Sequence, residues 1–142
     1  MEKLDFIIHT LKELFEKGNL LAIEEAFDLN YTAHAGEKTY HGHAFINKYA
    51  KQIRKSINNI KVVKVTLLAQ NDDILTWQRT FTGVHTKALK GIPASNKKIR
   101  WYEIVVTRFE KGKIIEEGNH RDLLTEKGLY SAMWRQQIGE RK

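Results

Sequence analysis

The sequence predicts one α+β domain, in which three N-terminal helices precede a four-stranded antiparallel sheet. Apolar residues recur at three- and four-residue steps up to about residue 57, which is typical of amphipathic helices. After residue 59 the chain becomes rich in Val and Ile and alternates between apolar and polar residues, which indicates strands. With 142 residues and 42% hydrophobic content, residues 1–142 are expected to share one core, with the helices on one face of a twisted sheet.

The first predicted helix carries its apolar stripe over residues 4–15. It ends at Gly18-Asn19, two residue types that accept left-handed backbone angles. A shorter helix is predicted over residues 20–27 and a third over residues 45–57. Residues 28–42 break every period and mix turn formers with aromatics and histidines, so we expect an irregular segment there.

The predicted strands are bounded by turn signals. They cover residues 60–70, 74–85, 99–109 and 114–115. Residues 87–97 contain the sole proline of the chain and are expected to form a loop. A closing helix is predicted over residues 123–137.

The composition narrows the function classes. The sequence contains no cysteine, which excludes disulfides, thiolate catalysis and cysteine-ligated metals. Residues 1–5 lack the pattern of a signal peptide, and no stretch approaches the roughly 20 apolar residues of a membrane span, so a cytoplasmic protein without membrane contact is expected. The net charge of +7 is scattered and accompanies no nucleic-acid motif, which favours a solvated basic surface over nucleic-acid binding.

Short motifs follow one another along most of the chain. They are Tyr31-Thr32-Ala33-His34, Tyr40-His41-Gly42, Phe81-Thr82-Gly83-Val84-His85-Thr86, Gly91-Ile92-Pro93 before Lys97-Lys98-Ile99, and Arg108-Phe109-Glu110-Lys111-Gly112-Lys113-Ile114-Ile115-Glu116-Glu117. In this order and spacing they resemble the SnoaL-like polyketide cyclase family. The resemblance implies the cone-shaped fold of nuclear transport factor 2-like proteins, with helices packed in a curved antiparallel sheet.

The resemblance also implies a function. Cyclases of this family close a polyketide ring by aldol chemistry in a pocket without a cofactor, and an acidic residue just after the G-K-I-x-E strand is the general acid/base. We therefore expect no cofactor, a small apolar or aromatic ligand, and a homodimer. The outward strand face with Tyr102, Ile104 and Val106 is a candidate dimer interface.

The chain departs from the family where the chemistry is expected. The family commonly continues E-x-W-D-x-x-D, but Gly118 replaces the tryptophan and Asn119 the first aspartate. An amide cannot abstract a proton, so the acidic position has become Asn119 or has moved to Asp122. Val105 stands where the family often has a polar or ionisable residue in mid-strand.

A second resemblance covers residues 112–137, which look like the end of an ABC-exporter nucleotide-binding domain. Such a domain needs a glycine-rich phosphate loop ending in Lys-Ser/Thr, and no segment of the sequence has that spacing. The chain is also too short for that domain. We do not expect an ATPase function.

Two strand faces supply candidate pocket residues. Trp77, Arg79 and Phe81 share one face, and Trp101 and Glu103 share a face of a later strand. If both faces lie on the same side of the sheet, Arg79 pairs with Glu103 beneath the indoles, either as a closed ion pair of the core or as a substrate-orienting group. In an apolar pocket Glu103 would hold its proton tightly and could act as acid or base.

The histidines and the C-terminal acids allow more than one interpretation. His34, His41 and His43 lie close in sequence but lack the partners of a zinc site, so hydrogen-bonding histidines are favoured and no metal is expected. Glu116 and Glu117 are expected to form a surface pair. Asp122 either caps the last helix or takes part in catalysis.

Two functions follow from these patterns. The first is proton-transfer chemistry on a small carbonyl or polyketide-like compound, as in a cyclase or isomerase. Its catalytic candidates are Glu103, Asp122, His120 and His34, and its substrate-binding candidates are Trp77, Arg79, Phe81, Trp101, Asn119 and Tyr31. The second is a non-catalytic ligand-binding or protein-interaction domain on the same scaffold. A carboxylate that points into an enclosed cavity would favour the enzyme.

Overall fold

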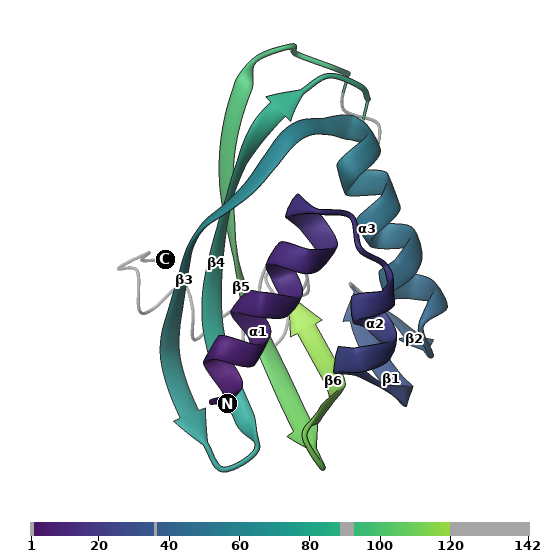
Figure 1. The fold of residues 1–142 in the computed structure, drawn as a ribbon, viewed down its shortest axis with the longest axis vertical. Coiled ribbons are helices and arrows are strands. Elements are labelled where there is room, and N and C mark those ends of the chain that lie inside the picture. Colours follow the sequence, from purple (N-terminus) through teal and green to yellow (C-terminus); the bar gives the residue numbers. More distant parts are fainter. Residues whose placement is uncertain (1, 36, 89–92, 120–142) are drawn as a thin grey trace, which may run out of the picture.

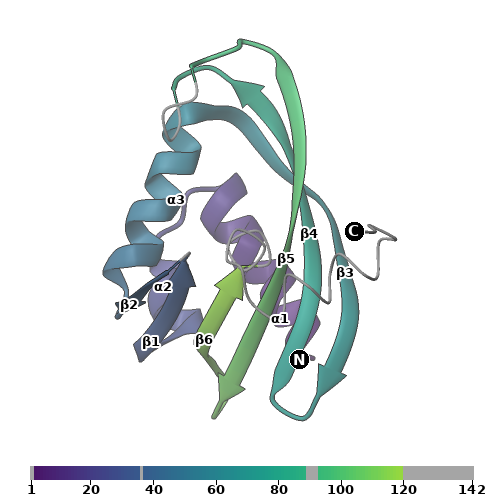
Figure 2. The same cartoon turned by 180° about the vertical axis from the view of Figure 1, so that it is seen from behind.

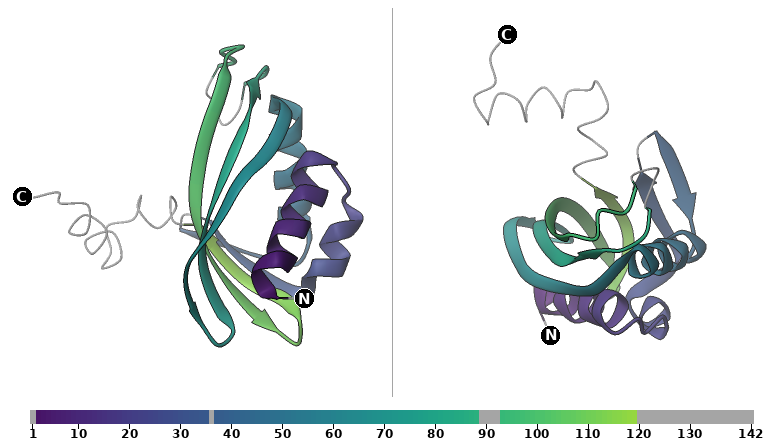
Figure 3. Two further views of the ribbon diagram at one scale, coloured as in Figure 1. Left: turned by 60° about the vertical axis from the view of Figure 1, so that its left-hand side comes forward. Right: turned by 90° about the horizontal axis from the view of Figure 1, so that it is seen from above.

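A curved six-stranded sheet forms the centre of the molecule, in the strand order β2-β1-β6-β5-β4-β3. The computed structural model describes residues 2–35, 37–88 and 93–119. The strands are β1 (Phe27–Ala35), β2 (Lys38–His41), β3 (Ile57–Asn71), β4 (Ile74–His85), β5 (Lys98–Glu110) and β6 (Lys113–Asn119). Figure 1 and the side view in Figure 3 show that the helices all cover one face of this sheet, which bends around them.

The helical segments lie where the apolar periodicity predicts them. Helix α1 (Lys3–Leu11) continues into a π-helical turn, η1 (Lys12–Glu16), and α2 (Leu21–Ala26) and α3 (Ala44–Ser56) follow. Gly18 ends the first helical unit with a φ of 71°, and a Cβ there would lie 2.6 Å from Arg54 Nε. Glycine therefore suits both the backbone angle and the close approach of α3. In the described residues no helix is long and apolar enough to cross a membrane.

The sequence prediction of a four-stranded antiparallel sheet was wrong. The sheet has six strands and is mixed, with parallel and antiparallel pairs. Residues 28–42, predicted to be irregular, form most of the β1–β2 hairpin, and β1 runs parallel to β6. The strand pattern was obscured because β1 shifts register between Phe27 and Thr32 and all of β2 is exposed. A strand with polar residues and an irregular register lacks the period on which sequence reading depends. The predicted helix over residues 123–137 lies outside the described residues.

The long strands β3, β4 and β5 were predicted closely, and they form the tall part of the sheet seen from behind in Figure 2. The β3–β4 pairing shifts register at three places, and such irregularities bend and twist a strand pair. The main core lies between the curved sheet and the helices. Its largest fully buried side chains include Trp77, Tyr31, Phe15 and Phe81.

Candidate functional site

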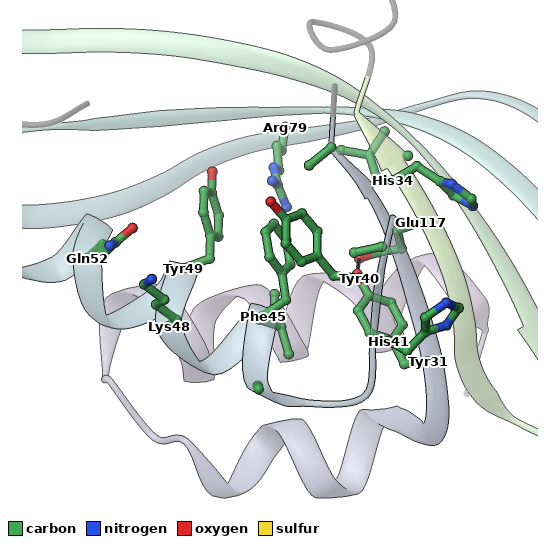
Figure 4. Close-up of a pocket in the computed structure, with 16 residues that line it drawn as sticks. Tyr31, His34, Tyr40, His41, Phe45, Lys48, Tyr49, Gln52, Arg79 and Glu117 are labelled. Atoms are coloured by element: carbon green, nitrogen blue, oxygen red, sulfur yellow. Dashed lines mark hydrogen bonds between the residues drawn. The ribbon is translucent and has the colours of Figure 1, made fainter. Parts of the chain in front are cut away.

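A cavity of about 530 Å³ lies between α3, the β1–β2 hairpin and the inner face of the sheet, as Figure 4 shows. This volume is within the range of small-molecule sites. The described residues that line it are Tyr31, Ala33, His34, Ala35, Tyr40, His41, Ala44, Phe45, Ile46, Lys48, Tyr49, Gln52, Arg79, Val105, Glu117 and Gly118. They come from β1, β2, α3, β4, β5 and β6, so the site depends on the whole fold.

The lining separates into a buried floor and an exposed rim. Tyr31, Ala33, Ile46, Arg79 and Val105 are all buried and form the floor together with Glu117. The rim residues are exposed, and they include His34, Tyr40, His41, Ala44, Lys48 and Gln52. A ligand would therefore meet polar groups at the rim and a mainly apolar interior with few polar groups.

Glu117 reaches the floor because of an extra residue in β6. Phe109 pairs with Ile114, but the next residue of β5, Arg108, pairs with Glu116, so Ile115 is the extra residue. The shift reverses the alternation of β6 and places Glu117 opposite the fully buried Thr107. In a regular register from the same Phe109–Ile114 pair, Glu116 would instead lie opposite Thr107 and face inward, and Glu117 would face outward.

Hydroxyl groups hold the Glu117 carboxylate. The Tyr31 hydroxyl donates to Oε1 over 3.0 Å, and the Thr107 hydroxyl donates to Oε2 over 2.7 Å. The Trp77 indole N–H in turn donates to Thr107 Oγ1 over 2.9 Å. Because the indole occupies an acceptor site of Thr107, the hydroxyl proton of Thr107 is directed at Glu117. Each oxygen of the Glu117 carboxylate therefore accepts a hydrogen bond from a neutral hydroxyl group.

The environment of Glu117 favours its protonated form. Burial raises the pKa of Glu117 above its ordinary value, although the hydrogen bond from Thr107, the charge of Arg79 and the hydrogen bond from Tyr31 oppose the rise. Burial also raises the pKa of Tyr31 well above its ordinary value, and the neighbouring Glu117 charge adds to this. A carboxyl group with a raised pKa next to a phenol has the chemistry of a candidate proton donor or acceptor.

Arg79 and Glu103 form a closed ion pair beside this floor. The two residues are direct partners in the β4–β5 register, so they share the inner face of the sheet. Arg79 Nε and Nη2 donate to Glu103 Oε1 over 2.9 and 2.6 Å, and both residues are buried. Burial disfavours the guanidinium charge, but Glu103, Tyr49 and Glu117 outweigh this effect and raise the pKa of Arg79.

Aromatic rings lie around the Arg79 guanidinium and along the pocket. The Arg79 guanidinium lies 5.3 to 5.8 Å from the ring centroids of Phe15, Trp77 and Phe81, within the range of cation–π contacts. In the pocket, Phe45 is stacked on Tyr40 at 4.5 Å and is nearly parallel to Tyr49 at 6.2 Å. We call Tyr40, Phe45 and Tyr49 the aromatic row. It forms the α3 side of the pocket in Figure 4.

The three clustered histidines have separate hydrogen-bond partners. His34 Nε2 lies 2.6 Å from Glu116 Oε2, His41 Nδ1 lies 3.2 Å from Thr32 Oγ1, and His43 Nε2 lies near two backbone carbonyl oxygens. His34 and His41 line the rim of the pocket, whereas His43 does not. Among the described residues, no group of three or more His, Asp or Glu side chains is placed to hold a metal ion.

The structure separates the other predicted site residues. Tyr31, Arg79 and His34 line the pocket, but Phe81 and Trp101 stack on each other at 5.0 Å outside its lining. Trp77 is 1% exposed and borders a small neighbouring recess, so it acts on the pocket through Thr107 rather than as a wall. The Cα of Asn119 pairs with that of Val105. His120 and Asp122 lie outside the described residues.

Sequence reading missed the main carboxylate and the aromatic row. Glu117 was expected to form a surface pair with Glu116 beside the turn, and regular alternation after Ile114 would not have corrected this, since it turns Glu117 outward. The aromatic row was missed because Tyr40 lies in the hairpin that was expected to be irregular. Phe45 and Tyr49 were recognised as part of the apolar stripe of α3, but a stripe does not reveal which residues face a cavity rather than the core.

Comparisons with known proteins identify the family and the fold. The sequence profile of the SnoaL-like polyketide cyclase family matches residues 6–127. The chain belongs to this family. The resemblance of the ordered motifs is thereby confirmed, as is an α+β fold with a curved sheet of the nuclear transport factor 2-like type.

Solved structures of this SnoaL-like type share the fold at low sequence identity. TsrD of Streptomyces laurentii is 14% identical with a TM-score of 0.71, over 99% of each chain. A candidate polyketide cyclase of Pseudomonas putida KT2440 is 12% identical with a TM-score of 0.70, over 88% of this chain and 97% of the other. IdmH of Streptomyces antibioticus, also a candidate polyketide cyclase, is 15% identical with a TM-score of 0.68, over 83% of this chain and 91% of the other.

One curated protein matches a short stretch. Heavy metal tolerance factor 1 of Caenorhabditis elegans is 48% identical over 33 residues. The match covers 23% of this chain, and the chain spans about 4% of the length of that protein. A match of this extent says nothing about the activity of this SnoaL-like chain.

Proposed function

We propose that this SnoaL-like protein binds a small carbonyl or polyketide-like molecule in the pocket and catalyses proton transfer on it, as a cyclase or isomerase does. The observation that carries the proposal is Glu117, a carboxylate on the floor of a pocket of about 530 Å³, with a raised pKa and hydroxyl donors on both oxygens. Family membership supports the same reaction class.

The proposed step uses the residues of the floor. Glu117 Oε1 takes a proton from the carbon next to a ligand carbonyl, and the electron pair of the C–H bond moves into an enolate. The Tyr31 hydroxyl, hydrogen-bonded to the same carboxyl, keeps that oxygen in place. The carboxyl then returns its proton to another atom of the ligand, so the step balances without an oxidant or reductant. Ala33, Ile46 and Val105 limit access of water to the floor.

The direct test is proton exchange on a simple ketone. Acetophenone in D2O exchanges its methyl protons slowly, and NMR follows the exchange. We expect the wild-type protein to accelerate the exchange and Glu117→Gln to abolish the acceleration, because the amide cannot accept the proton. Glu116→Gln is the matched control, since Glu116 pairs with His34 and Arg108 rather than facing the floor. Equal acceleration by the wild type and Glu117→Gln would contradict the assignment of Glu117.

The second candidate is a non-catalytic ligand-binding domain. Two observations favour it: Glu103 is held in the closed pair with Arg79, and the family acidic position is Asn119 in this chain. Under this alternative Glu117 accepts a hydrogen bond from, or donates one to, a bound ligand and transfers no proton. Ligand binding that persists in Glu117→Gln, without any acceleration of exchange by the wild type, would favour this alternative.

The outer face of the sheet supports a proposal of a homodimer. Tyr102 is 68% exposed and Leu68 49% exposed, and Ile104 and Val106 lie on the same outward side of β5 as Tyr102. Exposed apolar residues on a sheet face favour association. Light scattering after size-exclusion chromatography should give twice the mass of the chain, and Tyr102→Glu should return it to the monomer. A monomeric wild-type protein would contradict the proposal.

A further inference from the structure

The helix beside the pocket carries a strong positive charge. Its basic residues are Lys48, Lys51, Arg54 and Lys55, all of them exposed, and it contains no Asp or Glu. Arg54 reaches back to the carbonyl oxygens of Phe15 and Glu16, at 2.7 and 2.9 Å. The wall of the pocket is therefore a source of positive potential at its mouth.

Lys48 brings this charge to the pocket itself. Ala44, Lys48 and Gln52 are spaced four residues apart, so they form one exposed row of α3 along the rim. Lys51 and Lys55 belong to the same helix but not to the lining. In the part of the chain that the structure describes, Lys48 takes part in none of the ion pairs.

The rest of the described lining strengthens this asymmetry. The imidazoles of His34 and His41 lie on the hairpin side of the rim. Among these lining residues the one carboxylate is Glu117, and it lies on the floor. On the floor the Arg79 charge is paired with Glu103 and lies beside Glu117, and at the rim His34 is hydrogen-bonded to Glu116. Lys48 is therefore the rim charge that attracts an anion to the mouth, and low-dielectric walls enhance this attraction.

The aromatic row supplies the surface between mouth and floor. Phe45 and Tyr49 come from the same helix as Lys48, and Tyr40 extends their row into the hairpin. Rings of this kind pack against a flat conjugated molecule by stacking or by edge-to-face contact. Lys48 lines the same pocket as the aromatic row, so a molecule in contact with the row shares the cavity with the ammonium group.

We propose that the pocket takes a conjugated or aromatic small molecule that bears an anionic group, with its ring system against the aromatic row and its anion at Lys48. This inference rests on the proposed function and adds a ligand class to it. The end of the molecule opposite the anion reaches Glu117. A carboxylate, sulfonate or phosphate would meet the rim in the same way, because each presents oxygen acceptors to an ammonium donor.

A matched pair of fluorescent probes tests the proposal. 8-Anilinonaphthalene-1-sulfonate and N-phenyl-1-naphthylamine share one ring system and differ in the sulfonate. We expect Lys48→Met to weaken binding of the sulfonate probe about three- to fivefold, because a single solvent-exposed ion pair is lost. The affinity for the neutral probe should stay within about twofold. Fluorescence titration at low ionic strength measures both affinities.

Two further variants make the result specific. Lys51→Met removes the same charge from the same helix outside the lining and should leave both affinities unchanged. Ala44→Trp fills the mouth and should abolish binding of both probes. The proposal is overturned if Lys48→Met weakens the binding of both probes equally or of neither. It is also overturned if Lys51→Met has the same effect as Lys48→Met, or if the Ala44→Trp variant still binds both probes.

The outcome is independent of proton transfer. The probes measure binding alone, so a protein without catalytic activity can still show selection of the sulfonate through Lys48. Conversely, if exchange is lost in Glu117→Gln but Lys48→Met weakens the binding of both probes equally or of neither, the reaction is supported and the anionic ligand is contradicted. Glu117→Gln itself should keep the preference for the sulfonate.

Discussion

Glu103 and Glu117 lie on the same inner face of the sheet, yet their hydrogen-bond partners differ. Glu103 is fully enclosed and accepts two hydrogen bonds from the Arg79 guanidinium. Glu117 lines the pocket, and the groups that donate to its oxygens are the neutral hydroxyls of Tyr31 and Thr107. A cation in direct contact keeps a carboxylate ionised, whereas neutral donors in an apolar site leave its proton exchangeable. The two regions show that the same residue type meets a charged partner in one place and neutral donors in the other.

The largest expected effect comes from breaking the closed pair. Glu103→Gln keeps the shape of the side chain but leaves the Arg79 charge buried without its carboxylate. We expect a loss of about 3–5 kcal/mol in the free energy of unfolding. Urea denaturation followed by tryptophan fluorescence measures this. A loss below about 1 kcal/mol would mean that the pair is not the buried, charged contact described above.

A smaller effect is expected from the hydrogen-bond chain that supports Glu117. Thr107→Val removes the hydroxyl between Trp77 and Glu117 and leaves both without that partner. The expected cost is about 1–3 kcal/mol in the free energy of unfolding. The pKa of Glu117 should also rise, because a donor to its charged form is lost. Carbon-13 NMR of labelled glutamate carboxyl groups measures the titration.

Thr107→Ser is the matched control for that change, since it keeps the hydroxyl and removes a methyl group. It should leave the pKa of Glu117 close to the wild-type value. Trp77→Phe should raise that pKa by less than Thr107→Val does, because it frees the Thr107 hydroxyl without removing it. An unchanged pKa of Glu117 in Thr107→Val would contradict the role of the Trp77–Thr107–Glu117 hydrogen bonds.

The pH dependence of the free energy of unfolding tests the raised pKa of Glu117. Its folded-state pKa is raised above the ordinary value of 4.5, so the folded state binds the proton more tightly than the unfolded state. The wild type therefore loses stability as the pH rises from the ordinary value through the raised one. Glu117→Gln should lose this part of the pH dependence and gain relative stability above that window. Denaturation series at several pH values test this, and parallel curves for the two proteins would contradict it.

The smallest effect is expected at the surface. Glu116 lies 2.6 Å from His34 and 2.9 Å from Arg108 Nη2, and these side chains are 35 to 45% exposed. The hydrogen bond of His34 is the main cause that lowers the pKa of Glu116, and Arg108 adds to it. The stabilisation that Glu116 gives the folded state is present above its ordinary pKa of 4.5. It is lost as the pH falls through the lowered pKa of the folded state. Glu116→Gln should cost less than about 1 kcal/mol near neutral pH in the same urea assay, because solvent screens the pair.

Local sequence patterns predicted the regular parts of this fold. The apolar spacing of residues 4–15 and 45–57 locates α1 and α3, and the alternation around Trp77 and Glu103 locates β4 and β5 with their inner faces. The same alternation allowed the Arg79–Glu103 pairing to be anticipated as one alternative. Such features are readable because a helix or strand repeats its environment at a fixed period.

The site residues beyond these patterns depend on contacts between distant segments. Tyr31 and Glu117 are 86 residues apart and meet because β1 runs parallel to β6, a pairing that no local period indicates. Lys48 lines the rim of the pocket because the β1–β2 hairpin lies opposite α3 in the folded structure. Neither the hairpin nor this placement was expected from residues 28–42.

What the sequence alone determined is the α+β class, the family, and the inner faces of the long strands, because these depend on periodicity and on ordered motifs. Which acid faces the pocket was decided by the tertiary structure. One extra residue, Ile115, turns Glu117 inward and Glu116 outward, and that shift exists only in the pairing of β6 with β5. The physical reason is that side chains alternate along a strand, so a single inserted residue exchanges the two faces.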